Sequence, residues 1–196
     1  MKPEYWDRAK RALRRNDPVM GAIIGRHPRV HLVARGDAFV TLARAIAGQQ
    51  ISVKAAQSVW NRLVAVVLEM TPERVLAQER PRLRACGLSD RKVEYIADLA
   101  KHFSDGTIQV TRWPQMADEE VIAELVQVRG IGRWTAEMLL MFSLLRPNVL
   151  PVDDLGLRRA TSRHYFDGED VGADELRAFG ERWEPWRSVA TWYLWR

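Results

Sequence analysis

Apolar residues recur at helical spacing along almost the whole chain, and the alternation typical of β-strands is nearly absent. Between Asp37 and Met70 the helical pattern is interrupted only near Gly48, which predicts two core-facing helices joined by a polar elbow. The apolar positions on either side of the elbow are Phe39, Leu42, Ala43 and Ile46, then Ala55, Ala56, Val59, Trp60 and Leu63. The sequence therefore predicts an all-α fold.

Helix-breaking residues divide the middle of the chain into short helices. Thr71 and the proline after it are typical of a helix start. We expect breaks at Pro81 and Gly87, a new helix after Ser89 and its end at Gly106.

The residue pattern over 118–143 predicts a helix, a hairpin and a second helix. Acidic residues fill a first turn, an apolar run follows, and the chain turns through Gly130 and Gly132 before the helical pattern resumes. A chain of 196 residues without a long linker fits one domain or two closely joined lobes.

The charge balance favours a polyanionic partner. Thirty Lys and Arg residues stand against 25 Asp and Glu, which gives a net charge of +5. Arginine pairs with phosphates, and the release of counterions drives such association. The alternative is that these charged side chains only form solvent-exposed helix faces, and composition alone does not decide between the two.

Cysteine and histidine usage excludes several kinds of site. The only cysteine, Cys86, excludes an internal disulfide, a four-cysteine iron–sulfur cluster and a multi-cysteine zinc site. The four histidines, at positions 27, 31, 102 and 164, show no ligand spacing, so we expect no catalytic metal. The N-terminus does not resemble a signal peptide, and no apolar run reaches the ~20 residues that span a bilayer. We therefore expect a soluble cytoplasmic protein without membrane association.

Two motifs carry candidate chemistry. Gly130 and Gly132 lack the preceding strand and the third glycine of a dinucleotide-binding turn. They fit either a helix end with a tight turn, or a loop whose backbone N–H groups bind a DNA phosphate. Downstream, Asp153 and Asp154 precede another helical run; because a helix needs one cap, the second carboxylate is available for another role.

The segment 128–157 resembles the helix-hairpin-helix, Gly-Pro-Asp DNA glycosylases, most closely the branch of DNA-3-methyladenine glycosylase II. Three more blocks are similar to that branch in the same order: "ARAIAGQQISVKAAQSVW", "GLSDRKVEYIADLA" and "ERWEPWRSVATWYLW". The resemblance runs from about Asp37 to the C-terminus, and we expect no counterpart of the β-rich N-terminal domain that some members carry. It implies one glycosylase domain over residues 1–196, with two lobes, an active-site cleft between them and the helix-hairpin-helix at 118–143.

The resemblance also implies a reaction. Asp154 matches the catalytic aspartate, which stabilises the positive charge on the deoxyribose while the flipped-out base leaves, and Asp153 takes the capping role. Trp134 stands where the lyase branches carry a nucleophilic lysine, so the enzyme is expected to release the base without cutting the strand. Its partner is double-stranded DNA with alkylated purines such as 3-methyladenine and 7-methylguanine. We expect a monomer without a cofactor.

Further residues take roles by the same resemblance. The base pocket is lined by Trp134, Met138 and Trp195. DNA is contacted by Gln50, the wedge that fills the gap left by the flipped base, and by Gly130, Gly132 and Arg133. A monovalent cation is expected at the backbone carbonyls of Val126, Val128 and Ile131.

Three other expectations concern packing and folding. Arg129 replaces the usual hairpin proline, which should loosen the turn and add a charge near phosphate. The hairpin glycines should be replaceable without loss of folding. The core should contain Trp183, Trp186 and Trp192.

Two other functions remain open from the sequence. A non-catalytic helix-hairpin-helix module would explain the charge and the two glycines, but not the second carboxylate. A glycosylase for oxidised or mismatched bases would share the fold and the aspartate. The identity of a base released from alkylated DNA distinguishes all three.

Overall fold

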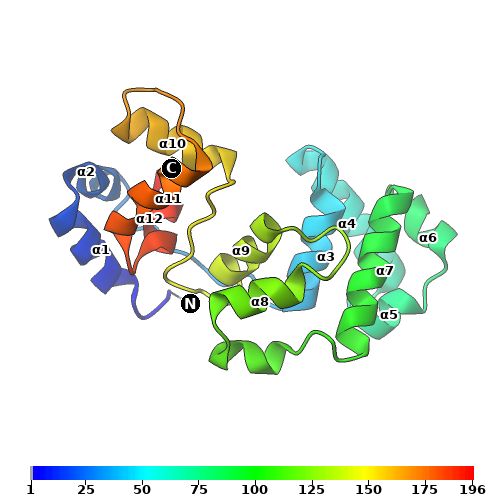
Figure 1. Ribbon diagram of the computed structural model, residues 1–196. Helices are drawn as coiled ribbons and strands as arrows, with labels where there is room; N and C mark the ends of the chain where they lie inside the picture. Colours follow the sequence, from blue (N-terminus) through cyan, green and yellow to red (C-terminus); the bar gives the residue numbers. More distant parts are fainter. Residues whose placement is uncertain (1) are drawn as a thin grey trace. The chain divides into compact units, whose positions relative to one another are not determined.

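The computed structural model describes residues 2–196, which form helices and no strands, and this confirms the all-α prediction. Figure 1 shows the order of the helices along the chain. Their bounds are α1 Trp6–Asn16, α2 Pro18–Arg26, α3 Ala38–Gly48, α4 Val53–Val67, α5 Pro72–Leu76, α6 Arg80–Ala85, α7 Asp90–Ser104, η1 Val110–Gln115, α8 Asp118–Leu125, α9 Arg133–Phe142, α10 Leu155–Tyr165, α11 Ala173–Phe179, η2 Gly180–Trp183 and α12 Arg187–Leu194. No helix within the described residues is long and apolar enough to cross a membrane.

The chain folds into two compact units. Unit 2 is the continuous segment Arg35–Leu139, and unit 1 combines the residues up to Ala34 with Leu140–Arg196. The boundary falls within α9, so the hairpin belongs to unit 2 and the Asp153–Asp154 pair to unit 1.

Unit 2 is built around α3 and α7. In this unit α3 packs against α4 and α7, and α7 also packs against α5. Its buried side chains include Phe39, Leu42, Ile46, Leu63 and Leu99, which recur at the helical spacing seen in the sequence. The expected elbow near Gly48 is the short connection between α3 and α4.

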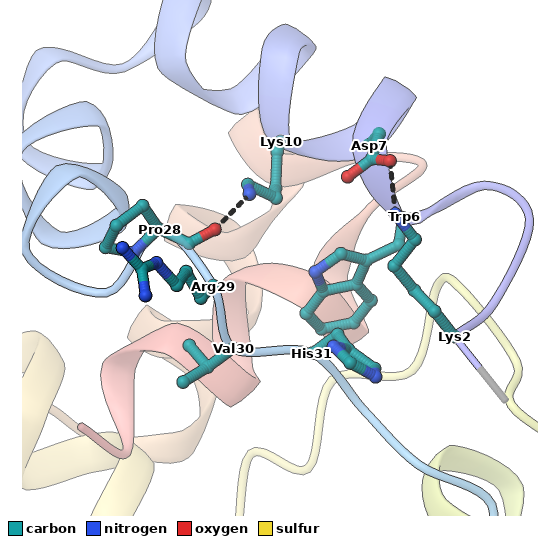
Figure 2. A pocket seen from close by; sticks show the side chains of 8 residues that line it. All are labelled: Lys2, Trp6, Asp7, Lys10, Pro28, Arg29, Val30 and His31. Carbon is teal, nitrogen blue, oxygen red and sulfur yellow. Dashed lines mark hydrogen bonds and ion pairs between the residues drawn. The ribbon is translucent and has the colours of Figure 1, made fainter.

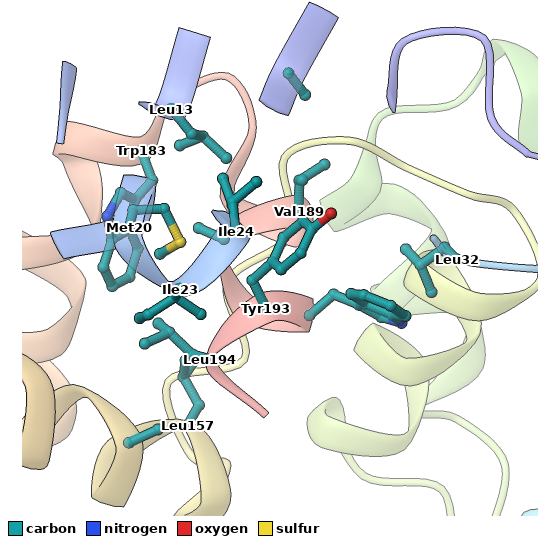
Figure 3. Close-up of a cluster of buried hydrophobic side chains, with 14 of the residues drawn as sticks. Leu13, Met20, Ile23, Ile24, Leu32, Leu157, Trp183, Val189, Tyr193 and Leu194 are labelled. Carbon is teal, nitrogen blue, oxygen red and sulfur yellow. The ribbon is translucent and has the colours of Figure 1, made fainter. Parts of the chain in front are cut away.

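Unit 1 has an aromatic core, in which α1, α2, α10 and α12 meet (Figure 3). Trp183 and Trp192 are buried in this core and Trp186 packs against it, as expected from the sequence. The side chains of Trp6 and Trp192 meet edge to face at 5.3 Å.

A buried carboxylate, that of Asp17, ties three parts of unit 1 together. One oxygen caps α2 by accepting a hydrogen bond from Met20 N at 2.9 Å. The other accepts from Tyr165 Oη at 2.8 Å and from Trp183 Nε1 at 3.0 Å. Burial, together with this bond to Asp17, raises the pKa of Tyr165. A buried polar group with its partners in place fixes how the helices around it pack.

Two helix starts predicted from capping residues are confirmed, and one predicted helix break is not. Thr71 and Ser89 cap α5 and α7 through their side chains. Pro81, however, does not break a helix, because it lies in the first turn of α6. A proline is tolerated there, since a first-turn N–H has no partner within the helix.

Candidate functional site

Asp154 is the N-cap of α10. Its Oδ1 accepts a hydrogen bond from Leu157 N at 2.6 Å. The capping role expected for Asp153 is therefore wrong: Asp153 lies one residue too early, and its side chain is exposed. The cap and the candidate catalytic group are the same residue.

Trp195 follows the end of α12 and contacts this carboxylate directly. Its Nε1 donates a hydrogen bond to Asp154 Oδ1 at 2.9 Å. Its ring stacks on Phe142, with the ring centroids 5.9 Å apart and the planes 15° from parallel. The sequence predicted Trp195 as a pocket wall, but neither its bond to Asp154 nor the stacking on Phe142.

Gly156 completes this cluster, and the sequence reading did not identify it. A Cβ at this position would lie 3.1 Å from Asp154 Oδ1 and 3.4 Å from Trp195 Nε1. Any other residue would crowd the bond between the two side chains. The sequence feature that could have identified Gly156 is its place in the first turn of a helix, because a glycine there lowers helix stability and does not end the helix.

Trp134 and Met138 lie one helical turn apart at the start of α9 in unit 2. The side chain of Trp134 is 44% exposed, and Met138 is half-buried. Residues four apart share a helix face, so both belong to one partly exposed stripe. Their contact with a base stays a prediction.

The hairpin between α8 and α9 is fixed to α7. Gly130 has a φ of +81°, and a Cβ there would lie 2.2 Å from Tyr95 Cδ2. The backbone N–H of Arg129 donates to Asp98 Oδ2 at 2.9 Å. A side chain at Gly130 therefore carries a cost in folding stability that the sequence did not predict, while survival of the fold stays a prediction. Gly132 has open space around it.

Arg133, the first residue of α9, is engaged by two carboxylates. It forms a two-pronged hydrogen-bonded ion pair with Glu119 on α8, and its Nε donates to Glu137 Oε1 at 3.1 Å. Glu119 also raises the pKa of the guanidinium. The pair holds α8 and α9 together beside the hairpin, while a contact of Arg133 with DNA stays a prediction.

The carbonyls predicted to hold a cation lie at the entry to this hairpin. Val128 O accepts a hydrogen bond from Ile131 N at 3.1 Å, and a carbonyl oxygen has a second lone pair for another partner. The cation itself stays a prediction. Within residues 2–196, no three His, Cys, Asp or Glu side chains gather as a metal-binding group.

The loop at residues 47–52, which we call the wedge loop, carries Gln50 at its tip. Gln50 is exposed and has a φ of +57°, in a left-handed region that costs a non-glycine residue about 1 kcal/mol. Gln49, its neighbour, donates from Nε2 to Gly130 O at 2.8 Å. Lys92 Nζ donates to Ala47 O at 2.9 Å and to Gln49 O at 2.7 Å. Burial lowers the pKa of Lys92.

A separate cavity of about 340 Å³ lies in unit 1, beside α1 and the segment that follows α2 (Figure 2). Lys10 Nζ donates to Pro28 O, and Lys2 pairs with Asp7. The lining contains no residue to which the sequence gave a role. It consists of Lys2, Trp6, Asp7, Lys10, Pro28, Arg29, Val30 and His31.

The chain is similar to one known family and to several solved structures. Residues 43–186 match the family described as "HhH-GPD superfamily base excision DNA repair protein". A Bacillus subtilis relative is 33% identical over 185 residues; the match covers 90% of this chain and 64% of the relative, so the chain spans slightly less than two thirds of that protein.

Two solved structures are similar over nearly the whole chain. DNA-3-methyladenine glycosidase from Bacillus halodurans has a TM-score of 0.87 and 34% identity, with 95% of this chain and 87% of that chain covered. The Schizosaccharomyces pombe 3-methyladenine DNA glycosylase in complex with abasic DNA has a TM-score of 0.81 and 31% identity, with 96% of this chain and 95% of that chain covered.

Proposed function

Because the chain belongs to the HhH-GPD superfamily of base excision DNA repair proteins, we propose that it is a monofunctional DNA glycosylase for alkylated purines. It binds double-stranded DNA, turns the damaged nucleotide out of the duplex and hydrolyses the N-glycosidic bond. The substrates are purines of the 3-methyladenine and 7-methylguanine type; the two similar structures are glycosylases named for 3-methyladenine. The protein acts as a cytoplasmic monomer without a cofactor.

The observation that carries this proposal is the fixed carboxylate of Asp154. Two N–H donors, from Leu157 and Trp195, hold its Oδ1 in place. A carboxylate oriented in advance stabilises the positive charge that builds on the deoxyribose as the base departs, without reorganising during the reaction. Water then adds to the sugar. A base methylated at a ring nitrogen already carries positive charge, so its departure needs no general acid.

Trp134 supports the monofunctional assignment. It is exposed at the start of α9, where the lyase branches carry a lysine. An indole nitrogen cannot form a Schiff base with the sugar, so no covalent intermediate forms and the strand stays intact.

Aromatic rings supply the preference for cationic bases. The ring of Trp195 lies against Phe142 and beside Asp154, so an electron-rich face and a carboxylate are close together. A cation over such a face gains about 0.5–2 kcal/mol. The rest of the discrimination comes from the weak glycosidic bond of the alkylated nucleotide.

The test is the incubation of purified protein with a duplex that carries a single 7-methylguanine. We expect free 7-methylguanine by chromatography, a strand that breaks only after alkali, and no borohydride-trapped complex. DNA binding without base release would instead indicate a non-catalytic helix-hairpin-helix module. Release of only oxidised or mismatched bases would indicate another glycosylase branch.

A further inference from the structure

One face of α7 holds two separate loops of unit 2. Lys92, Tyr95 and Asp98 follow at intervals of three residues, so they lie along one side of the helix. Lys92 binds the carbonyls at the end of α3, where the wedge loop begins. Tyr95 and Asp98 contact the hairpin at Gly130 and Arg129.

Gln49 joins these two loops directly. Its side-chain amide donates to the carbonyl of Gly130 at 2.8 Å, across 81 positions of sequence. Its own carbonyl is held by Lys92 at 2.7 Å. Gln49 is therefore fixed at both its backbone and its side chain.

The next residue, Gln50, is held in an unfavourable backbone conformation. Its φ of +57° is rare for a side chain larger than glycine, and such a conformation persists only when its surroundings impose it. On one side of Gln50 the chain is fixed through Gln49. On the other side, Ser52 caps α4 by accepting a hydrogen bond from Ala55 N.

We propose that Gln49 is a positioning residue that couples the wedge loop to the hairpin. While the hairpin binds the phosphate backbone, Gln49 holds Gln50 in the position from which its side chain enters the DNA base stack. This inference rests on the proposed function, in which Gln50 fills the gap in the duplex. The hydrogen bond from Gln49 Nε2 to Gly130 O holds the tip of the wedge loop at a fixed position relative to the hairpin. The protein then binds a duplex that lacks one base more tightly than it binds an intact duplex.

The experiment measures this preference by binding alone. Affinity is determined for a duplex with a tetrahydrofuran abasic analogue and for the same duplex intact, at one salt concentration. Gln49→Met keeps the length of the side chain but removes the donor. We expect it to reduce the preference for the abasic duplex about fivefold, the effect of one lost hydrogen bond, and to leave affinity for intact DNA unchanged.

A double-mutant cycle separates coupling from independent contacts. If Gln49 acts through Gln50, Gln49→Met has no further effect on the preference in a Gln50→Ala background. Gln109→Met is the matched control, because the Gln109 amide also donates to a glycine carbonyl, Gly106 O at 3.0 Å, outside both loops. This control should retain the wild-type preference.

Three outcomes would overturn the inference: additive effects in the cycle, an equal loss of affinity for intact and abasic DNA, or a wild-type protein with no preference for the abasic duplex. The binding measurements require no base release. Failure of the proposed glycosylase activity is therefore recognised separately, in the 7-methylguanine assay.

Discussion

At the scale of single residues, Asp154 combines a structural and a proposed chemical role on one side chain. Asn is as good a helix cap as Asp, so Asp154→Asn should keep the cap of α10 while it removes the negative charge. We expect DNA affinity and melting temperature close to wild type, and single-turnover base release slower by about 10²-fold or more. Asp153→Asn is the control and should change neither quantity. Normal excision by the Asp154 variant would refute the catalytic assignment.

Trp195 contributes both an N–H donor and a ring. Trp195→Phe keeps a ring to stack on Phe142 but loses the hydrogen bond to Asp154. We expect base release to slow about tenfold, because a hydrogen bond to a charged group is lost. Trp195→Ala should slow it further by removing the aromatic face. Equal rates for all three proteins would place Trp195 outside the reaction, and a parallel fall in melting temperature would make it a packing residue.

At the scale of elements, the two hairpin glycines are not equivalent. Gly130→Ala introduces a Cβ at a positive φ and against the Tyr95 ring, so we expect a loss of about 2–3 kcal/mol in the free energy of unfolding. Gly132→Ala meets no atom within 4 Å and should fold normally. It should weaken binding to damaged and intact DNA alike, since phosphate contacts carry no sequence information. Urea unfolding and DNA titrations with both variants distinguish these effects.

Arg133 links α8 to α9, and its removal leaves the buried Glu137 without this cation. We expect Arg133→Ala to cost about 1–2 kcal/mol of stability. Each phosphate contact contributes about 0.9 to the slope of log affinity against log salt. Because Glu119 and Glu137 already balance the guanidinium, we expect this slope to change by much less than the DNA contact predicted from the sequence would give. A decrease of about 0.9 in the slope of log affinity against log salt would show that Arg133 binds a phosphate as well.

Sequence patterns located the elements better than the contacts between them. Periodicity and capping residues predicted α3, α4, α7 and the hairpin, because such signals act over one or two helical turns. The capping role was assigned to Asp153 instead of Asp154 because adjacent carboxylates look alike until the first helical residue is known. The bond from Gln49 to Gly130 could not be predicted, since it joins residues 81 positions apart.

At the scale of the whole molecule, partly or fully buried tyrosines make the free energy of unfolding depend on pH in the alkaline range. Burial raises the pKa of Tyr5 to about 12 and also raises the pKa of Tyr165 and Tyr193. The unfolded chain ionises its tyrosines near pH 10. The stability from keeping them neutral is therefore complete below about pH 10 and lost as the pH rises above it. Urea unfolding at pH 8, 10 and 11 should show this decline, and Tyr165→Phe should make it shallower; an unchanged decline would contradict the role of Tyr165.

The division of the chain between the two units has a consequence for its synthesis on the ribosome. Unit 2 is continuous, so it can close its core as soon as Leu139 has emerged. Unit 1 cannot: Asp17 is made early, but its partners Tyr165 and Trp183 arrive only after the whole of unit 2 has been translated. At roughly 5–20 residues per second, the apolar faces of α1 and α2 wait for several seconds or longer without α10 and α12. During that interval the nascent chain exposes Trp6 and Met20, which the finished protein buries completely in the core of unit 1.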